Sequence, residues 1–149
     1  MRIALVASAG GHLALLLRLR PWFQDHERFW VVLDGPDARH HLAAEDAVFR
    51  PGPTNRRPLR ALTELPTALR LLAERRPDVL VTNGAGLAVP YVLAARLRSI
   101  PAIFWEVPDR VGPASWTGRL VAPLCDEVVW SVPEQRAAYP RGRWLGPVL

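Results

Sequence analysis

Short apolar runs alternate along the chain with segments in which apolar residues recur every three or four positions. The apolar runs predict strands, and they are Arg2–Ser8, Phe29–Leu33, Ala47–Arg50, Asp78–Thr82, Pro101–Glu106, Glu127–Ser131 and Trp144–Leu145. The periodic segments predict helices, and they are Gly11–Gln24, Asp37–Glu45, Leu59–Arg76, Leu87–Arg98, Ser115–Leu124 and Pro133–Tyr139. Pro66 should kink or split the third helix, and Ser115 should cap the fifth.

Strands that alternate with helices form a parallel sheet covered by helices on both faces. With right-handed crossovers this predicts a doubly wound, Rossmann-like α/β fold, in which ligands bind beyond the carboxyl ends of the strands. The loops at those ends are Ala9–His12, Asp34–Asp37, Arg50–Pro58, Asn83–Gly86 and Glu106–Pro113.

The composition fits one globular domain, residues 1–149. Half of the residues are hydrophobic and 22% are charged, which is not the composition of a disordered chain. The single Cys125 excludes an internal disulfide and a cysteine-based zinc site, and we expect no metal and no cofactor. No apolar run reaches the roughly 18 residues of a transmembrane helix, and Met1 leads into a strand without a signal peptide. We therefore expect a cytoplasmic protein, at most peripheral to a membrane.

The first loop carries Gly10, Gly11 and His12. Glycines at a strand-to-helix turn let backbone N–H groups approach a ligand, and the helix N-terminus behind them favours an anion. The alternative is a tight turn that needs glycine for geometry alone. His12, in the first helical turn, is expected to act as a neutral donor or acceptor.

Asn83-Gly84-Ala85-Gly86 repeats this arrangement after the fourth predicted strand. Two such loops predict two walls of one cleft, while helix packing is the alternative role for Gly84 and Gly86. Glu106 follows a buried strand, where a carboxylate is costly unless it is paired or functional. It is the best candidate for a general base, and an ion pair with Arg110 is the structural alternative.

All 19 basic side chains are arginines, and the net charge is +5. Arg50, Arg56, Arg57 and Arg60 surround one loop, which is either a solvated basic face or a surface for lipid phosphate. Nucleic acid is not expected, because no aromatic residues are interleaved with these arginines. The first predicted helix is apolar almost all round. We expect burial within the fold to account for this, and the alternatives are contact with a neighbouring helix, with a partner subunit or with a bilayer near Trp22.

Four segments jointly resemble one family, in the same order and over nearly the whole chain. They are ASAGGHL, PDVLVTNGAGLAVP, IPAIFWEVPDRVGPASWTGRLVAPLCDEVVW and YPRGRWLGPVL. The family is the membrane-recruiting subunit of the two-subunit UDP-N-acetylglucosamine transferase of N-glycan assembly, with bacterial relatives among capsule and exopolysaccharide glycosyltransferase subunits. The lipid II-forming N-acetylglucosaminyltransferase of peptidoglycan synthesis is more distantly similar, with its own Gly-Gly-His loop and a Glu that matches Glu106.

This resemblance implies the N-terminal, acceptor-side half of a GT-B glycosyltransferase at the inner face of the plasma membrane. A separate C-terminal-type subunit would bind the UDP-sugar, and this chain would bind a polyprenyl-diphosphate-linked acceptor. Glu106 and His12 would be catalytic, and Arg56 and Arg57 would face the membrane. The acceptor diphosphate or lipid would be bound by Gly10, Gly11, Asn83, Gly84, Ala85, Gly86 and Arg110.

The sequence departs from the family at three points. Asn83 stands where Ser or Thr is expected, Trp105 stands where a smaller aliphatic residue is common, and the N-terminal membrane helix of eukaryotic members has no counterpart. The alternative function is a non-catalytic scaffold that recruits a partner glycosyltransferase to the membrane. A nucleotide-binding reductase is disfavoured, because no Gly-x-Gly-x-x-Gly follows the first strand.

Overall fold

The computed structural model describes residues 1–52 and 63–146, and within these ranges seven strands form one parallel sheet. The strand order is β3-β2-β1-β4-β5-β6-β7. The strands are β1 (Arg2–Ala7), β2 (Glu27–Leu33), β3 (Ala47–Arg50), β4 (Val79–Thr82), β5 (Ala102–Trp105), β6 (Glu127–Trp130) and β7 (Arg143–Trp144). The helices are α1 (Gly11–Arg18), α2 (Arg20–Phe23), α3 (Pro36–His41), α5 (Leu65–Arg75), α6 (Ala88–Leu97), α7 (Trp116–Val121), η1 (Ala122–Leu124) and η2 (Pro133–Ala137).

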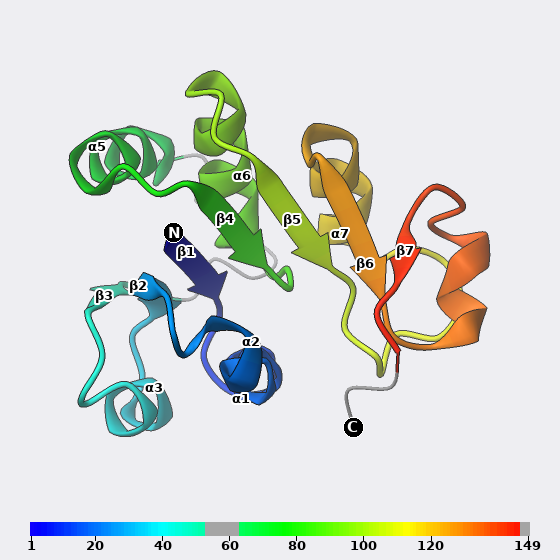
Figure 1. Ribbon diagram of the computed structural model, residues 1–149, viewed down its shortest axis with the longest axis horizontal. Coiled ribbons are helices and arrows are strands. Elements are labelled where there is room, and N and C mark those ends of the chain that lie inside the picture. Colours follow the sequence, from blue (N-terminus) through cyan, green and yellow to red (C-terminus); the bar gives the residue numbers. More distant parts are fainter. Residues whose placement is uncertain (53–62, 147–149) are drawn as a thin grey trace.

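Helices cover both faces of the sheet, as the alternating pattern predicts. Figure 1 shows α1, α2 and α3 on one side and α5, α6 and α7 on the other. Successive side chains of a strand point to opposite faces, so β1 contributes to two separate cores. Ile3 and Leu5 pack with the α1–α3 layer, whereas Ala4 and Val6 pack with the α5–α7 layer. The doubly wound, Rossmann-like prediction is confirmed.

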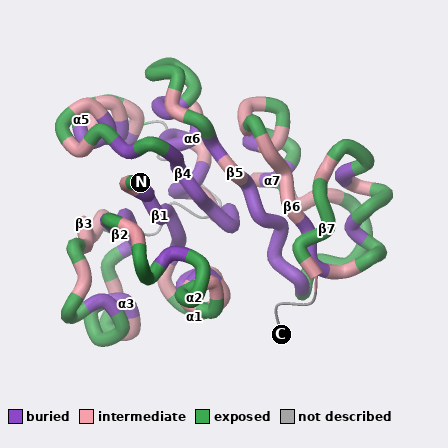
Figure 2. The backbone as a smooth tube through the Cα atoms, viewed as in Figure 1, coloured by how far each residue is buried: buried purple, intermediate pink, exposed green. Residues whose placement is uncertain are grey.

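The order of the strands reverses between β1 and β4. From β1 the chain proceeds to β2 and β3 on one side, and it returns to β4 on the other side before continuing to β7. Both central strands are buried along most of their length (Figure 2). Ligands of open α/β sheets bind at such a reversal, outside the carboxyl ends of the strands, so the loops after β1 and β4 define the edge where a site is expected.

The largest differences from the predicted helices are at three places, and the other helix ends differ by at most two residues. The predicted helix at 11–24 is two helices, α1 and α2, separated at Leu19, because Pro21 has no N–H to continue the hydrogen-bond ladder. The predicted helix at 37–45 ends at His41. α5 begins at Leu65 with Pro66 in its first turn, a position that tolerates proline; the part of that prediction before residue 63 lies outside the described residues.

Candidate functional site

The loops after β1 and β4 are joined by a reciprocal pair of hydrogen bonds between His12 and Asn83. The Asn83 amide nitrogen Nδ2 donates to the backbone oxygen of His12 at 2.6 Å, and His12 Nδ1 lies 3.1 Å from the backbone oxygen of Asn83. Asn83 is buried, and its Oδ1 has no partner among the described residues. The two loops that the sequence places at one edge of the sheet therefore contact each other directly.

The contact with Asn83 also determines the tautomer of His12. A backbone carbonyl oxygen only accepts hydrogen bonds, so Nδ1 must carry the hydrogen in this contact. In a neutral ring Nε2 is then the unprotonated nitrogen. His12, which is half-buried, thus has one ring nitrogen bound to the fold, and the other is left to accept a hydrogen bond.

Gly10 and Gly11 differ in what the fold requires of them. Gly10 has a φ of 75°, where a side chain is strained, so the turn itself requires glycine there. Gly11 has no such φ, and a Cβ added to it would meet nothing within 4 Å. The geometric alternative therefore accounts for Gly10 and leaves Gly11 unexplained by the fold.

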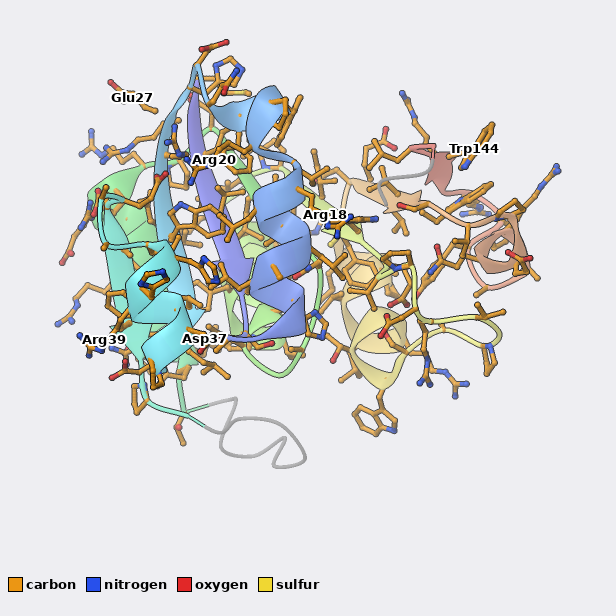
Figure 3. All side chains as sticks on the ribbon, turned by 90° about the horizontal axis from the view of Figure 1, so that it is seen from below. Arg18, Arg20, Glu27, Asp37, Arg39 and Trp144 are labelled. Carbon is orange, nitrogen blue, oxygen red and sulfur yellow. The ribbon has the colours of Figure 1, made fainter. Side chains whose placement is uncertain are left out.

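An acidic side chain already lies at the N-terminus of α1. The amide of Gly10 donates to Asp37 Oδ2 at 2.6 Å, and Asp37 stands in the first turn of α3. Figure 3 places Asp37 beside the start of α1 at this edge of the sheet. The following amides of α1, from Gly11 to Leu13, have no acceptor within the helix, because the first turn of any helix lacks one.

The turn after β4 is strained at a residue that is not glycine. Gly84 has a φ of 102° and Ala85 a φ of 65°, and the second value is unusual for a residue with a side chain. Gly84 is buried, and a Cβ there would lie 3.4 Å from Phe104 Cε2, 3.8 Å from His12 Cε1 and 3.9 Å from Thr117 Cγ2. This turn is therefore packed between the first loop, β5 and α7, and Gly86 follows it at the approach to α6.

Glu106 lies at the carboxyl end of β5 and is buried, with 1% of its surface exposed. Its Oε2 accepts a hydrogen bond from the backbone N–H of Ser115 at 3.2 Å and another from the hydroxyl of Tyr139. The Glu106–Arg110 ion pair considered as an alternative is not formed. Arg110 is exposed, and its backbone oxygen is held by Gln135 Nε2 at 3.1 Å, so the loop turns its side chain to solvent.

Ser115 supports this arrangement as the cap that the sequence predicts. Its Oγ accepts from the amide of Gly118 at 2.9 Å at the start of α7. Gln135 closes the same region from η2, because its Nε2 donates to the backbone oxygen of Val107 at 2.7 Å and its Oε1 accepts from the amide of Ser131 at 3.1 Å. The loop after β5 is thus held from both α7 and η2.

The structure revises the basic surface only in part. Arg50 forms an ion pair with the largely buried Glu64, with Nε 2.8 Å from Oε2, so it is no free surface cation. Arg56, Arg57 and Arg60 lie outside the described residues.

On the first helices Leu13 and Leu16 are buried while Trp22 is 46% exposed, so burial accounts for most of the apolar surface of these helices. Across residues 1–52 and 63–146, no helix combines the length and the apolar character needed to span a bilayer.

Sequence reasoning missed four residues that organise this region: Asp37, Ser115 as a partner of Glu106, Gly118 and Tyr139. Only Ser115 had a local signal, through its capping position. The other three act across the fold, and none belongs to a motif that predicts a contact. No group of His, Cys, Asp and Glu within the described ranges is arranged to hold a metal ion.

Solved structures with this arrangement place the fold in a known class. MurG of Acinetobacter baumannii superposes with a TM-score of 0.79 over 98% of this chain and 45% of that chain, at 19% identity. UDP-GlcNAc 2-epimerase of Neisseria meningitidis, solved with UDP-GlcNAc, gives a TM-score of 0.72 over 93% of this chain and 42% of that chain, at 12% identity. The fold is a Rossmann-like half-domain of the GT-B type, shared with MurG and with the epimerase.

Sequence comparison identifies the family within that class. The chain belongs to the family described as oligosaccharide biosynthesis protein Alg14 like, whose sequence model matches residues 56–148. It is also similar to the enzymes named UDP-N-acetylglucosamine–N-acetylmuramyl-(pentapeptide) pyrophosphoryl-undecaprenol N-acetylglucosamine transferase. That of Oceanobacillus iheyensis is 26% identical over 93% of this chain and 43% of its own length. That of Paenarthrobacter aurescens is 37% identical over 56% of this chain and 23% of its own length. The chain spans less than half the length of these relatives.

Proposed function

We propose that this protein is the acceptor-binding subunit of a two-component glycosyltransferase. It would bind a polyprenyl-diphosphate-linked saccharide, and a C-terminal-type subunit would supply the UDP-sugar in capsule, exopolysaccharide or related glycan synthesis. The observation that carries the proposal is membership in the Alg14-like family, together with the similarity of the chain to the MurG-type transferases. Residues 1–149 then form one acceptor-side domain.

The site residues support an acceptor role at the edge formed by the loops after β1, β4 and β5. Gly11 is open, and the free amides at the start of α1 are donors for a phosphate oxygen. The Asn83-Gly84-Ala85-Gly86 turn forms the adjoining side, and Arg110 is exposed at the loop after β5. Asp37 lies against the Gly10 amide, so we assign the diphosphate to the amides from Gly11 onward.

The proposed chemistry uses a base at this edge and no metal. An acceptor hydroxyl would give its proton to Glu106 while its oxygen bonds to the anomeric carbon of the donor sugar. The bond from that carbon to the nucleotide diphosphate would break, and the diphosphate would leave with the electron pair. His12 Nε2 is the second acceptor at this edge and would bind a neighbouring hydroxyl.

The alternative is a scaffold without catalytic residues. It is favoured by the burial of Glu106 and by its two hydrogen bonds to Tyr139 and Ser115, because a carboxylate used only for structure would be held in this way. The two proposals differ in what they predict for the neutral variant at this position, which is treated in the Discussion.

The test of subunit function is complementation. The purified chain is incubated with radiolabelled UDP-sugars and a lipid extract, either alone or with a C-terminal-type GT-B subunit from the same genome. We expect transfer to the lipid fraction only when both proteins are present. Robust transfer by this chain alone would contradict the division of labour, and no transfer with any such subunit would contradict the function.

A further inference from the structure

Glu106 uses one carboxylate oxygen for both of its hydrogen bonds. Oε2 accepts from the amide of Ser115 and from the hydroxyl of Tyr139, whereas Oε1 accepts none from the described residues. The carboxylate is therefore fixed through one oxygen, and the other is left for a further donor. This is the asymmetry that a base needs, because an oxygen already holding two donors is a poor acceptor of a third.

Tyr139 follows η2 and reaches Glu106 from a segment 33 residues further along the chain. It is 6% exposed, and its ring makes an edge contact with Phe104, with ring centroids 6.0 Å apart. Burial and, secondarily, the hydrogen bond to and negative charge of Glu106 raise the pKa of Tyr139. The phenol thus stays protonated, and remains a donor to Oε2, throughout the neutral range.

Gly118 makes the convergence of these groups possible. A Cβ at this position would overlap the Tyr139 hydroxyl oxygen and would lie 2.9 Å from both Glu106 Oε2 and Ser115 Oγ. Any larger residue must displace at least one of the three. Gly118 is the third residue of α7 after the cap Ser115. Glycine at this position is therefore explained by the space that the carboxylate and the phenol need, and not by helix propensity, which disfavours glycine.

Burial alone does not explain the Tyr139 contact. Tyr91 in α6 is fully buried, and its hydroxyl has no hydrogen-bond partner among the described residues. A buried phenol in this protein is thus tolerated without a partner, so a specific arrangement produced the contact with Glu106. Tyr91 also provides a matched control for removing a buried hydroxyl.

We propose that Tyr139 is a positioning residue for Glu106, whose hydroxyl, together with the Ser115 amide, holds Oε2 so that Oε1 is the oxygen that receives the acceptor proton. This inference rests on the proposed function. It adds that the segment after β6, through Tyr139, sets the orientation of the proposed base, and that Gly118 is kept small for the same purpose.

The test is a double-mutant cycle of Tyr139→Phe and Glu106→Gln, measured in the two-subunit assay and by urea unfolding. Tyr139→Phe should lower kcat by about 10- to 100-fold, because a misplaced group loses that much, with the acceptor KM changed less than about twofold. In the Glu106→Gln background the same change should leave kcat nearly unaltered, because the group that Tyr139 positions is gone. Tyr91→Phe should leave kcat unchanged.

The outcomes separate this inference from the proposed function. Full activity of Glu106→Gln refutes the base role and this inference with it, while the acceptor-binding function stands. Absence of transfer by the wild-type pair refutes the proposed function itself. If Glu106→Gln is slow but Tyr139→Phe has an unchanged kcat, only the positioning role is refuted. The same holds if Tyr139→Phe lowers kcat by the same factor in the wild-type and in the Glu106→Gln background. If the losses in free energy of unfolding of the two single variants simply add in the double variant, the contact between Tyr139 and Glu106 is refuted, whether or not transfer is detected.

A second variant reaches the same hydroxyl without altering it. Gly118→Ala should displace the Tyr139 hydroxyl and reduce kcat to a similar degree, while adding little to the loss already present in Tyr139→Phe. Full kcat in a folded Gly118→Ala would overturn the role assigned to Gly118. We therefore expect Gly118→Ala, Tyr139→Phe and the double variant to have about the same reduced kcat.

Discussion

His12 and Asn83, 71 residues apart in sequence, hold each other by two hydrogen bonds of opposite direction. The side chain of Asn83 donates to the backbone of His12, and the ring of His12 contacts the backbone of Asn83. This exchange joins the loops after β1 and β4 at the point where the strand order reverses. The geometry of the candidate site therefore depends on a residue at a position where the family resemblance leads us to expect Ser or Thr.

Removing this link should destabilise the protein. Asn83→Ala deletes the donor to His12 and should lower the free energy of unfolding by about 1–3 kcal/mol, the usual loss when a buried acceptor is left unpaired. Urea unfolding measures it. Asn83→Asp keeps the shape but places a second acceptor against the His12 oxygen, so it should cost at least as much. Wild-type stability in both variants would show that the exchange contributes nothing.

Glu106→Gln separates the two candidate functions. The amide oxygen of Gln can still accept from Ser115 and Tyr139, so the melting temperature should change by only a few degrees. Loss of the base should lower turnover by about 10²- to 10⁴-fold. Rate and melting temperature are measured on one preparation, with the partner subunit present. Unchanged turnover would instead support the scaffold.

Attachment to membranes should depend on surface charge. We expect the chain to float with anionic liposomes and to be released as salt rises, because exposed charges are screened. The double change Arg56→Ala and Arg57→Ala should weaken flotation, and Trp22→Ala should weaken it further, since Trp22 is 46% exposed. Trp144→Ala is the control, because Trp144 is 62% exposed on β7, far from α1 and α2 (Figure 3). Binding to neutral liposomes that is insensitive to salt would argue against the arginines.

The stability of the β2 region should depend on pH through Glu45. Burial, the largest single influence, opposes ionisation, but the hydrogen bonds and charge of Arg28, aided by Trp30 and Arg20, outweigh it and lower the pKa of Glu45 below its usual 4.5. The two oxygens lie 2.8 and 2.9 Å from Arg28 Nε and Nη2. A carboxyl with a lowered folded-state pKa stabilises the fold above its unfolded pKa, and this contribution is lost as pH falls through the folded value.

Glu45→Gln should therefore be less stable than wild type at pH 7, on the order of 1 kcal/mol. The difference should shrink as pH falls from the usual 4.5 through the lower pKa of the folded state, where the wild-type carboxyl also becomes protonated. Urea unfolding at pH 7 and pH 3 measures both values. Glu74→Gln serves as a control, because its exposed pair with Arg70 at 3.8 Å should contribute little. A difference that stays constant across this range would rule out the linkage.

The sequence by itself determined the strands, the faces they bury and the loops that gather at one edge. These follow from local signals: apolar runs, glycine and proline at the turns, and a serine before α7. The extent of Ala47–Arg50 as β3 and the cap by Ser115 agree with the structure. The break between α1 and α2 at Leu19 also follows from a local signal, because the missing N–H of Pro21 is enough to predict it.

Only the tertiary structure decided which polar groups meet at that edge. Asp37 reaches the Gly10 amide from another crossover, and Tyr139 reaches Glu106 from the segment beyond β6. No spacing in the chain encodes these contacts, because each depends on the length and direction of several crossovers and on the small size of Gly118 between them. Arg110 shows the same limit, since its nearness to Glu106 in sequence did not become a contact: the turn after Val107 directs it to solvent, and a phenol from a distant segment takes its place.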